Sequence, residues 1–290
     1  MGADGKGRVA VVTGASAGIG KAAAISLAGQ GWRVIGVGRN PERSRAALAE
    51  IRQAAPGAQV DMVVADLAEM AQTKRAADEI RGLTDRIDAL LNNAGGIGKA
   101  LVVTSEGNEA IFAGNHVGPF LLTRELLPLL RIAAKESPAG AVRVLNVSSS
   151  AADLSPGLDW DNLQMLESHQ ASPAYCNVKL ANLMFTRSLG ERLARDGIAV
   201  KAMHPGTVDT NFASYGDADL QAIVATMKDI TVTAGQGADT LVWLATEPQL
   251  PADPYFHERA PMAVPAFALD DANCARLWTE TEAIIARSLG

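Results

Sequence analysis

Thr13-Gly14-Ala15-Ser16-Ala17-Gly18-Ile19-Gly20 follows an apolar, largely β-branched run and precedes an alanine-rich stretch that ends at Gly29. The apolar run is typical of a buried parallel strand, and residues 21–29 are typical of a helix. Glycines between a strand and a helix permit a tight turn and a close approach to pyrophosphate, while the helix N-terminus adds positive potential. The stretch therefore predicts a dinucleotide cradle, although an ordinary strand-to-helix turn has the same glycines.

The same alternation continues along the chain. The predicted strands are residues 8–13, 33–37, 60–65, 89–91, 142–147 and 199–204, with a seventh near 262–266; the predicted helices are residues 21–29, 41–54, 71–81, 106–130 and 174–196. Alternating strands and helices predict an α/β fold, a single-domain Rossmann-type doubly wound parallel sheet of about seven strands with helices on both faces. Ligands of such sheets gather at the carboxyl ends of the strands.

Composition narrows the class of protein. The 290 residues, 48% of them hydrophobic, predict one large globular domain over residues 1–290. A net charge of −6 argues against a nucleic-acid partner. The cysteines and histidines have no metal-ligand spacing, so we expect no metal. Because no apolar run is long enough for a bilayer, we expect a cytoplasmic protein without a membrane anchor.

The residues at the end of the second predicted strand distinguish an NAD-binding protein from an NADP-binding one. A carboxylate there binds the ribose hydroxyls of NAD, whereas an arginine accepts the 2′-phosphate of NADP. The residues are Gly38-Arg39-Asn40, without an acid, and Ser16 adds a hydroxyl. The sequence favours NADP(H) and leaves NAD(H) open, because Arg39 also fits a solvated loop cation. Asp66 follows the third strand, where it can accept from the adenine amino group, cap a helix, or do both.

Tyr175 and Lys179 are one helical turn apart in Tyr-Cys-Asn-Val-Lys. Residues at i and i+4 share a helix face, and an ammonium group near a phenol lowers the pKa of that phenol. The pair predicts a proton donor that accompanies hydride transfer. The alternative is an amphipathic helix face with a half-buried tyrosine and a lysine that reaches to solvent.

Together these motifs resemble the short-chain dehydrogenase/reductase family over residues 7–288. The similar segments are Thr-Gly-Ala-Ser-Ala-Gly-Ile-Gly (13–20), Asp66-Leu67, Asn-Asn-Ala-Gly (92–95), Asn115, Asn-Val-Ser-Ser-Ser (146–150), Tyr-Cys-Asn-Val-Lys (175–179) and His-Pro-Gly-Thr-Val-Asp-Thr (204–210). Residues 115–123, 161–163 and 276–278, and the long insertion between Ser149 and Tyr175, are similar to the retinol dehydrogenase-like branch. The resemblance implies an NADP(H)-dependent carbonyl reductase or alcohol dehydrogenase.

The resemblance also implies a catalytic group of Asn115, Ser149, Tyr175 and Lys179. Tyr175 would be the general acid in carbonyl reduction or the base in alcohol oxidation, and Lys179 would tune it and bind the nicotinamide ribose. Ser149 would orient the carbonyl, with its two neighbouring serines as alternatives. Asn115 would hold a water that links Lys179 to solvent, although an asparagine inside a helix is also explained by bonds to the backbone.

The implied cofactor contacts extend over all the strand ends. They are Gly14, Ser16, Gly18, Ile19, Gly20, Arg39, Asp66, Leu67, Asn93, Ala94, Gly95, Tyr175, Lys179, Pro205, Gly206, Val208 and Thr210. Residues 93–95 would line the adenine ribose, and residues 205–210 would turn past the nicotinamide and bond its carboxamide or the pyrophosphate. Each of these segments also fits a simple turn.

The implied substrate is a small apolar aldehyde, ketone or secondary alcohol. The expected lack of an anchor argues against retinol itself, and a polyketide-type aromatic ketone is a rival. Residues 211–231 fit either a lid over such a substrate or an ordinary surface helix. A homo-oligomer is compatible with the resemblance, and a non-catalytic dinucleotide-sensing protein is the alternative from another class.

Overall fold

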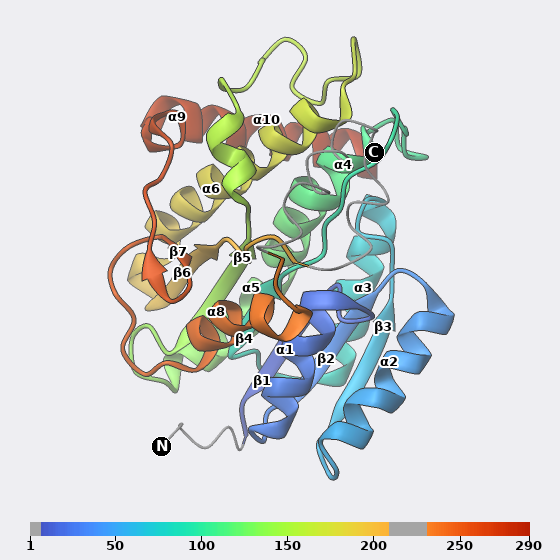
Figure 1. Cartoon of the computed structure of the whole chain (residues 1–290), viewed down its shortest axis with the longest axis vertical. Coiled ribbons are helices and arrows are strands. Elements are labelled where there is room, and N and C mark those ends of the chain that lie inside the picture. The colour runs from blue at the N-terminus through green and yellow to red at the C-terminus, as the bar shows by residue number, and fades with distance from the viewer. Residues whose placement is uncertain (1–6, 209–230) are drawn as a thin grey trace.

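The computed structural model describes residues 7–208 and 231–290. Within these residues one eight-stranded sheet has the order β3-β2-β1-β4-β5-β6-β7-β8 (Figure 1). Its strands are β1 (Val9–Thr13), β2 (Arg33–Gly38), β3 (Val60–Val64), β4 (Ala89–Asn92), β5 (Val142–Val147), β6 (Ile198–Met203), β7 (Tyr255–His257) and β8 (Ala260–Pro261). All neighbours are parallel except β7 and β8. The predicted doubly wound α/β fold is confirmed, with eight strands instead of about seven.

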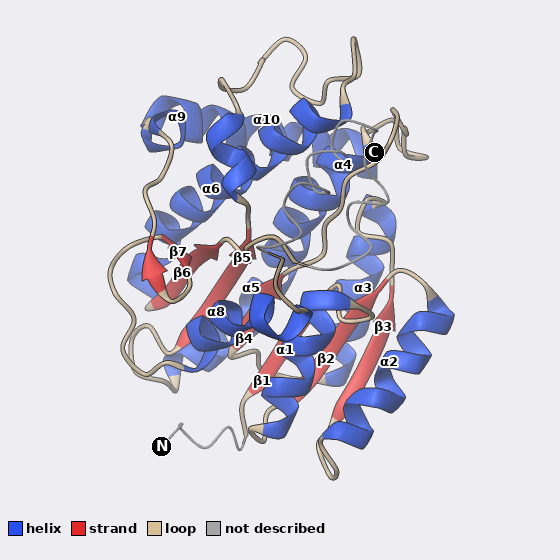
Figure 2. Ribbon diagram, in the orientation of Figure 1, coloured by secondary structure: helices blue, strands red, loops and turns tan. Residues whose placement is uncertain are grey.

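Helices cover both faces of the sheet (Figure 2). One face carries α1 (Gly18–Gly29), α2 (Pro41–Ala54) and α8 (Ala234–Thr246). The other carries α3 (Met70–Leu83), α5 (Gly118–Lys135) and α6 (Ala171–Leu193), with α10 (Asp271–Leu289) packed on α6. The short helices are α4 (Ala110–Phe112) and α9 (Ala266–Leu269).

Strand β1 shows why the central strands are apolar throughout. Val9 and Val11 pack into the core under α3, α5 and α6, while Ala10 and Val12 pack into the core under α1 and α8. Side chains alternate between the two faces of a strand, so a sheet that is covered on both faces needs apolar residues at every position. This is the pattern from which the sequence predicted the strand.

The predicted helix over residues 106–130 begins later, changes its winding and ends later. The Glu109 carboxylate accepts hydrogen bonds from the amides of Ile111 and Phe112, which makes it the N-cap of α4. A π-helical turn, Ala113–Val117, then joins α4 to α5. Glu106 lies outside this helix and instead accepts from the first two amides of α3.

The C-terminal part differs most from the sequence prediction. No strand was expected at β7 or β8, and the strand predicted near 262–266 is wrong, because α9 begins there. Glu258 and Arg259 have positive φ angles of 48° and 61°, and they form the tight reversal between β7 and β8. The helices α8, α9 and α10 were not predicted. Of the helices in the described ranges, none combines the length and apolar character needed to cross a membrane.

Candidate active site

The glycine-rich turn lies at the carboxyl end of β1 and leads directly into α1. Gly14 and Gly18 have φ angles of 70° and 52°, which favour glycine. A Cβ on Gly14 would lie 2.7 Å from the Asn93 amide nitrogen, and one on Gly20 would lie 2.5 Å from the Gly14 carbonyl oxygen. The backbone is therefore packed as closely as the predicted pyrophosphate cradle requires.

Thr13 joins this turn to the segment after β4. Its hydroxyl accepts from the amides of Asn93 and Ala94, each at 2.9 Å, and donates to Leu91. The Asn93 side chain donates to the Thr13 carbonyl at 2.8 Å. Asn93 thus supports the cradle from behind and is not among the residues that line the adjacent cavity, in contrast to Ala94 and Gly95. Thr13 was missed because one threonine at a strand end gives no sequence signal of its own.

A cavity of about 470 Å³ extends from the glycine turn between the ends of β2, β3 and β4. Its lining includes Gly14, Ser16, Arg39, Asp66, Leu67, Ala94, Gly95 and Asn115. Arg43, on α2, also lines it. The cavity and the glycine turn fit an adenosine and a pyrophosphate, and so these residues fit a dinucleotide.

Asp66 does not cap α3. The N-cap of that helix is Glu69, whereas Asp66 accepts from the Ala68 amide at 3.0 Å within a short turn. One Asp66 oxygen lies 3.6 Å from the Arg39 guanidinium, and the Arg39 side chain is 67% exposed. Both charged groups remain accessible at the cavity, so the position predicted for Arg39 is open to a ligand.

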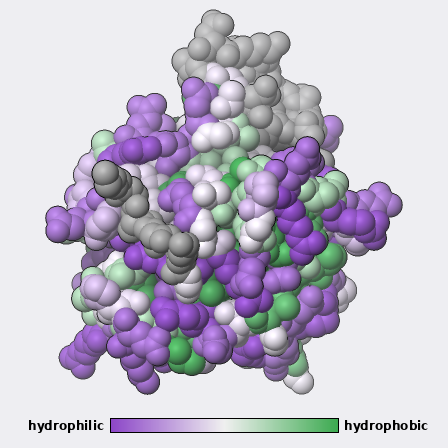
Figure 3. All heavy atoms as spheres, turned by 90° about the horizontal axis from the view of Figure 1, so that it is seen from below, coloured by the Kyte–Doolittle hydropathy of each residue, from purple (hydrophilic) through white to green (hydrophobic). Residues whose placement is uncertain are grey.

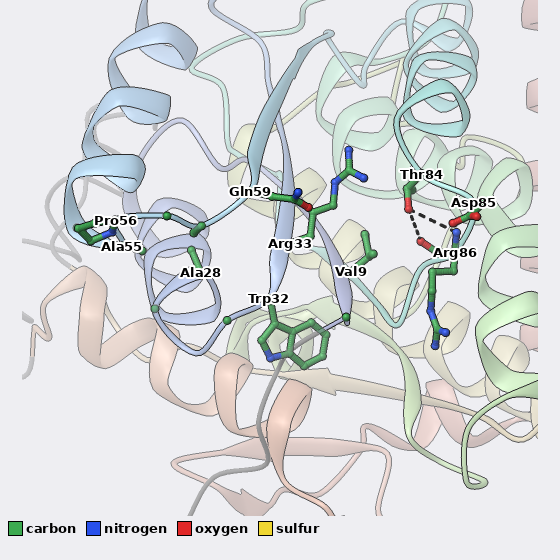
Figure 4. Close-up of a pocket in the computed structure, with 16 residues that line it drawn as sticks. Val9, Ala28, Trp32, Arg33, Ala55, Pro56, Gln59, Thr84, Asp85 and Arg86 are labelled. Atoms are coloured by element: carbon green, nitrogen blue, oxygen red, sulfur yellow. Dashed lines mark hydrogen bonds between the residues drawn. The ribbon is translucent and has the colours of Figure 1, made fainter.

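A second cavity, about 800 Å³, lies at the amino ends of β1 and β2, opposite the carboxyl ends where the first cavity lies (Figure 4). Trp32, Arg33 and Arg86 line it, and the Thr84 hydroxyl donates to the Arg86 carbonyl at 2.9 Å. The molecule seen from below shows mostly hydrophilic side chains with scattered hydrophobic ones (Figure 3). Arg33 and Arg86 are paired with Asp61 and Asp88, and no predicted site residue lines this cavity. Despite its larger volume, it is not the candidate active site.

The structure brings Ser149 to Tyr175. Ser149 follows β5, and a side-chain hydrogen bond joins it to Tyr175 on α6. Its neighbour Ser148 is buried and donates to the Lys179 carbonyl at 2.8 Å. Ser149, the serine that the sequence favoured among the three, is therefore bonded to the phenol.

Lys179 lies below the phenol in a buried position. Its Nζ donates to the Val147 carbonyl at 3.1 Å and lies 5.3 Å from the centre of the Tyr175 ring. Burial lowers the pKa of Lys179 to about 8 and raises the pKa of Tyr175, while the bond with Ser149 opposes the shift on the phenol. The pKa of Tyr175 is therefore raised by burial, whereas the sequence had predicted that the lysine would lower it.

Asn115 lies in the π-helical turn. Its amide nitrogen donates to the carbonyls of Gly96 and Ile111 at 3.0 and 2.8 Å, and its oxygen accepts from the Gly96 amide at 3.1 Å. A Cβ on Gly95 would lie 2.4 Å from this oxygen and 3.5 Å from Lys179 Nζ. The side chain thus anchors residues 95–96 beside Lys179, and its bonds are to the backbone, as the alternative explanation expected. π-Helical turns are frequent at functional sites.

The segment after β6 runs beside the serine turn. His204 Nδ1 accepts from the Ser150 amide at 3.3 Å, and the His204 carbonyl accepts from His257 Nδ1 at 3.0 Å. Burial and the neighbouring His257 lower the pKa of His204 to about 4. Pro205 and Gly206 follow, and Gly206 has a φ of 79°. The sequence assigned no chemistry to His204, because its partners come from distant strands.

Val208 pairs with Val232 and packs near Ile19. A Cβ on Gly237 would lie 2.7 Å from Val208 and 3.4 Å from Ile19, so these predicted contacts meet beside the start of α8. Thr210 and most of the predicted substrate loop lie outside the described residues.

The long insertion before Tyr175 packs against the C-terminal segment. The rings of Trp160 and Phe267 are stacked with centroids 6.3 Å apart, and the Arg276 guanidinium lies 4.9 Å from the centre of the Trp160 ring. On β7, the Tyr255 ring is buried and its hydroxyl has no hydrogen-bond partner among the described residues. The ring contacts of Trp160 hold the insertion against α9 and α10.

The chain is similar to known proteins over most of its length. The model of the family described as "short chain dehydrogenase" matches residues 8–221. Two relatives are "Putative daunorubicin C-13 ketoreductase DnrU" of Streptomyces sp. (strain C5), 35% identical over 96% of this chain and 93% of that protein, and human retinol dehydrogenase 13, 31% identical over 96% and 85%.

Solved structures share the fold of this chain. An uncharacterized protein from Mycobacterium paratuberculosis is 29% identical, covers 98% of this chain and 96% of its own, and has a TM-score of 0.76. A Pseudomonas aeruginosa RhlG/NADP active-site complex is 25% identical, covers 91% and 97%, and has a TM-score of 0.67. These similarities extend over nearly the whole chain.

Proposed function

The chain belongs to the short-chain dehydrogenase family, in its retinol dehydrogenase-like branch, and from that premise we propose that it reduces an apolar aldehyde or ketone with NADPH, with Tyr175 as the proton donor. Membership makes it an oxidoreductase that acts on CH–OH or C=O with a nicotinamide dinucleotide. The observation that carries the proposal is the meeting of Ser149, Tyr175 and Lys179 beside the carboxyl ends of the strands.

Each of these side chains has a role in the proposed reduction. A bound nicotinamide supplies the hydride. The Tyr175 phenol gives its proton to the carbonyl oxygen, and the Ser149 hydroxyl donates a hydrogen bond to the same oxygen as negative charge develops there. Lys179 places a positive charge near the phenol and favours its ionised form once the proton has left. In alcohol oxidation, the same groups act in the reverse direction.

The preference for NADPH rests on the charges around the cavity. The loop after β2 has no acid, and Arg39 and Arg43 both line the space near Ser16. A guanidinium binds phosphate with a planar pair of donors, which suits the 2′-phosphate of NADP. An NAD-linked alcohol dehydrogenase is the second candidate, because Asp66 offers a carboxylate beside Arg39.

The proposed cofactor contacts are the residues that the motifs and the family resemblance imply. They are Gly14, Ser16, Gly18, Ile19, Gly20, Arg39, Asp66, Leu67, Asn93, Ala94, Gly95, Pro205, Gly206, Val208 and Thr210, with Tyr175 and Lys179. We assign one NAD(P)-binding domain to residues 1–290, with the substrate loop at about 207–232 and the C-terminal segment at about 250–290. Packing of the insertion against the C-terminal segment supports this assignment.

The proposed substrate class is an apolar carbonyl compound, with aromatic ketones first. The Streptomyces relative is named for a ketone reduction on daunorubicin, and the human relative is named for retinol.

Replacement of the phenol tests the proposal. Tyr175→Phe is expected to lower kcat at least a thousandfold on any aromatic ketone that wild type reduces, because no other group replaces the proton donor. NADPH affinity, measured by fluorescence titration, should change less than threefold. Cys176→Ala is the matched control on the same helix and should keep wild-type kcat.

The rival from another class gives a different result. A dinucleotide sensor would bind NADPH and turn over no member of a panel of aldehydes, aromatic ketones and secondary alcohols in the wild-type protein. If Tyr175→Phe kept the wild-type kcat, the protein would still be an enzyme, but Tyr175 would not be its proton donor.

A further inference from the structure

The turn after β5 carries the Ser149 hydroxyl. Its backbone amides donate hydrogen bonds to acceptors on Ser149 itself and on the distant residue His204. Ser149 Oγ accepts from the Ala151 amide at 3.2 Å, and the Ser149 carbonyl accepts from the Ala152 amide at 3.0 Å. The Ser150 amide donates to His204 Nδ1 at 3.3 Å. The first amides of a helix have no partner within it, and here the 3₁₀ helix Ser150–Leu154 obtains its first partner from the end of β6.

His204 is itself fixed by β7. Its amide donates to the Phe256 carbonyl at 2.8 Å, and its carbonyl accepts from His257 Nδ1 at 3.0 Å. The two imidazole rings have centroids 4.8 Å apart. The backbone and the ring of His204 are therefore held before the chain turns at Pro205 and Gly206, so the direction of Nδ1 is defined.

This geometry specifies where the His204 proton lies. A ring nitrogen that accepts from an amide carries no proton, so neutral His204 carries its proton on Nε2. Burial and His257 lower its pKa to about 4, which keeps the ring neutral at neutral pH. The acceptor is thus available under the conditions in which the enzyme would act.

We propose that His204 is a positioning residue for the reaction: its Nδ1 holds the 149–151 turn so that the Ser149 hydroxyl stays on the Tyr175 phenol and the substrate carbonyl. The inference rests on the proposed function, since Ser149 is taken to act on that carbonyl. His204 also sets the start of the Pro205–Gly206 turn. One side chain therefore links the loop that carries the serine to the loop expected beside the nicotinamide.

Two substitutions distinguish the role of His204 Nδ1 as a hydrogen-bond acceptor from the packing role of the imidazole ring. His204→Asn places an amide oxygen near the position of Nδ1 and keeps the acceptor, while His204→Phe keeps the ring and its contact with His257 but offers no acceptor. We expect kcat on an aromatic ketone to fall about tenfold or more in His204→Phe and less than threefold in His204→Asn. NADPH affinity should be unchanged in both. A packing role would reverse the order, with the phenylalanine variant the more active.

Thermal unfolding shows whether both variants fold. If His204→Phe does not fold, His204→Gln replaces it, because its amide oxygen lies at the position of Nε2 and not of Nδ1. Wild-type kcat in the variant that lacks an acceptor at Nδ1 would overturn the inference.

A second readout does not depend on turnover. Long-range ¹H–¹⁵N spectra of the full-length protein at neutral pH are expected to show the His204 proton on Nε2. A proton on Nδ1 would overturn the inference, whatever the activity. A wild-type protein that reduces no carbonyl compound would refute the proposed function, and the spectrum would still decide the bond to Ser150.

Discussion

The two halves of the site are built in different ways. The cofactor half, around β1 to β4, is shaped by backbone and small side chains: Gly14 and Gly20 approach each other so closely that a methyl group does not fit. The reacting half, around β5 to β7, is shaped by polar side chains from distant segments, such as Ser149 with Tyr175 and His204 with Ser150. Close backbone packing therefore dominates the first half, while hydrogen bonds between polar groups of distant segments dominate the second.

The halves also differ in where charge is placed. Arg39 and Asp66 in the cofactor half remain partly or largely exposed. Lys179 in the reacting half is 5% exposed, and burial lowers its pKa. Burial of a titratable group costs stability, and such costs are common at catalytic sites. The comparison predicts that changes in the first half affect binding, while changes in the second affect chemistry and stability.

The largest effect on binding is expected from Gly20→Ala. Its Cβ would lie 2.5 Å from the Gly14 carbonyl oxygen, and that backbone cannot move without opening the cradle. We expect the Kd of NADPH, measured by calorimetry, to rise about a hundredfold or more, or about 3 kcal/mol. Gly29→Ala at the other end of α1 is the matched control, since its Cβ would meet no atom within 4 Å. Tight NADPH binding by Gly20→Ala would show that the cradle is not formed by close backbone approach.

Lys179→Met is expected to have an effect of similar size, on stability. The pKa of Lys179 is about 8 in the folded protein and near 10.5 in the unfolded chain, so the folded protein loses this proton at a lower pH. Wild type therefore bears the full penalty below pH 8, and its stability rises between pH 8 and 10.5. At pH 7 the ligand-free methionine variant should exceed wild type by about 3 kcal/mol in urea unfolding. This difference should shrink as the pH rises to 10; a constant difference would contradict the assignment.

Arg39→Ala should have a smaller effect, confined to one cofactor. The loss of an exposed guanidinium is expected to weaken NADPH binding about tenfold and leave NADH binding unchanged, because only NADPH carries the 2′-phosphate. Arg45→Ala on the neighbouring helix is the matched control, since Arg45 is exposed and does not line the cavity. Equal wild-type affinities for NADPH and NADH would remove the phosphate role from Arg39.

The sequence predicted the fold well where the signals are local. The helix Pro41–Ala54 and the strand Val142–Val147 have the predicted bounds, because a proline start and a β-branched apolar run are strong short-range signals. The strands and helices after residue 250 were missed or misplaced. There the strands contain only two or three residues, and the reversal at Glu258 and Arg259 has no glycine to mark it.

The site was predictable to the same extent. Motif spacing pointed to Ser149, Tyr175 and Lys179, and the structure brings the three together. Motif spacing could not reveal that burial raises the pKa of Tyr175, since burial depends on packing by distant segments. Nor could it find His204 or Thr13, whose roles depend on partners at other strand ends. Assignment of catalytic roles to these residues remains a prediction.

The smallest effect is expected from Tyr255→Phe, which tests the reacting half at its apolar edge. The Tyr255 hydroxyl is buried without a hydrogen-bond partner among the described residues, and burial raises the pKa of this phenol. Removal of an unpaired buried hydroxyl should leave the free energy of unfolding unchanged or raise it by up to about 1 kcal/mol in urea unfolding at pH 7. Tyr255→Leu, which also removes the ring, should destabilise the protein by about 2 kcal/mol. A loss of more than 1 kcal/mol in Tyr255→Phe would mean that the hydroxyl has a partner and stabilises the fold.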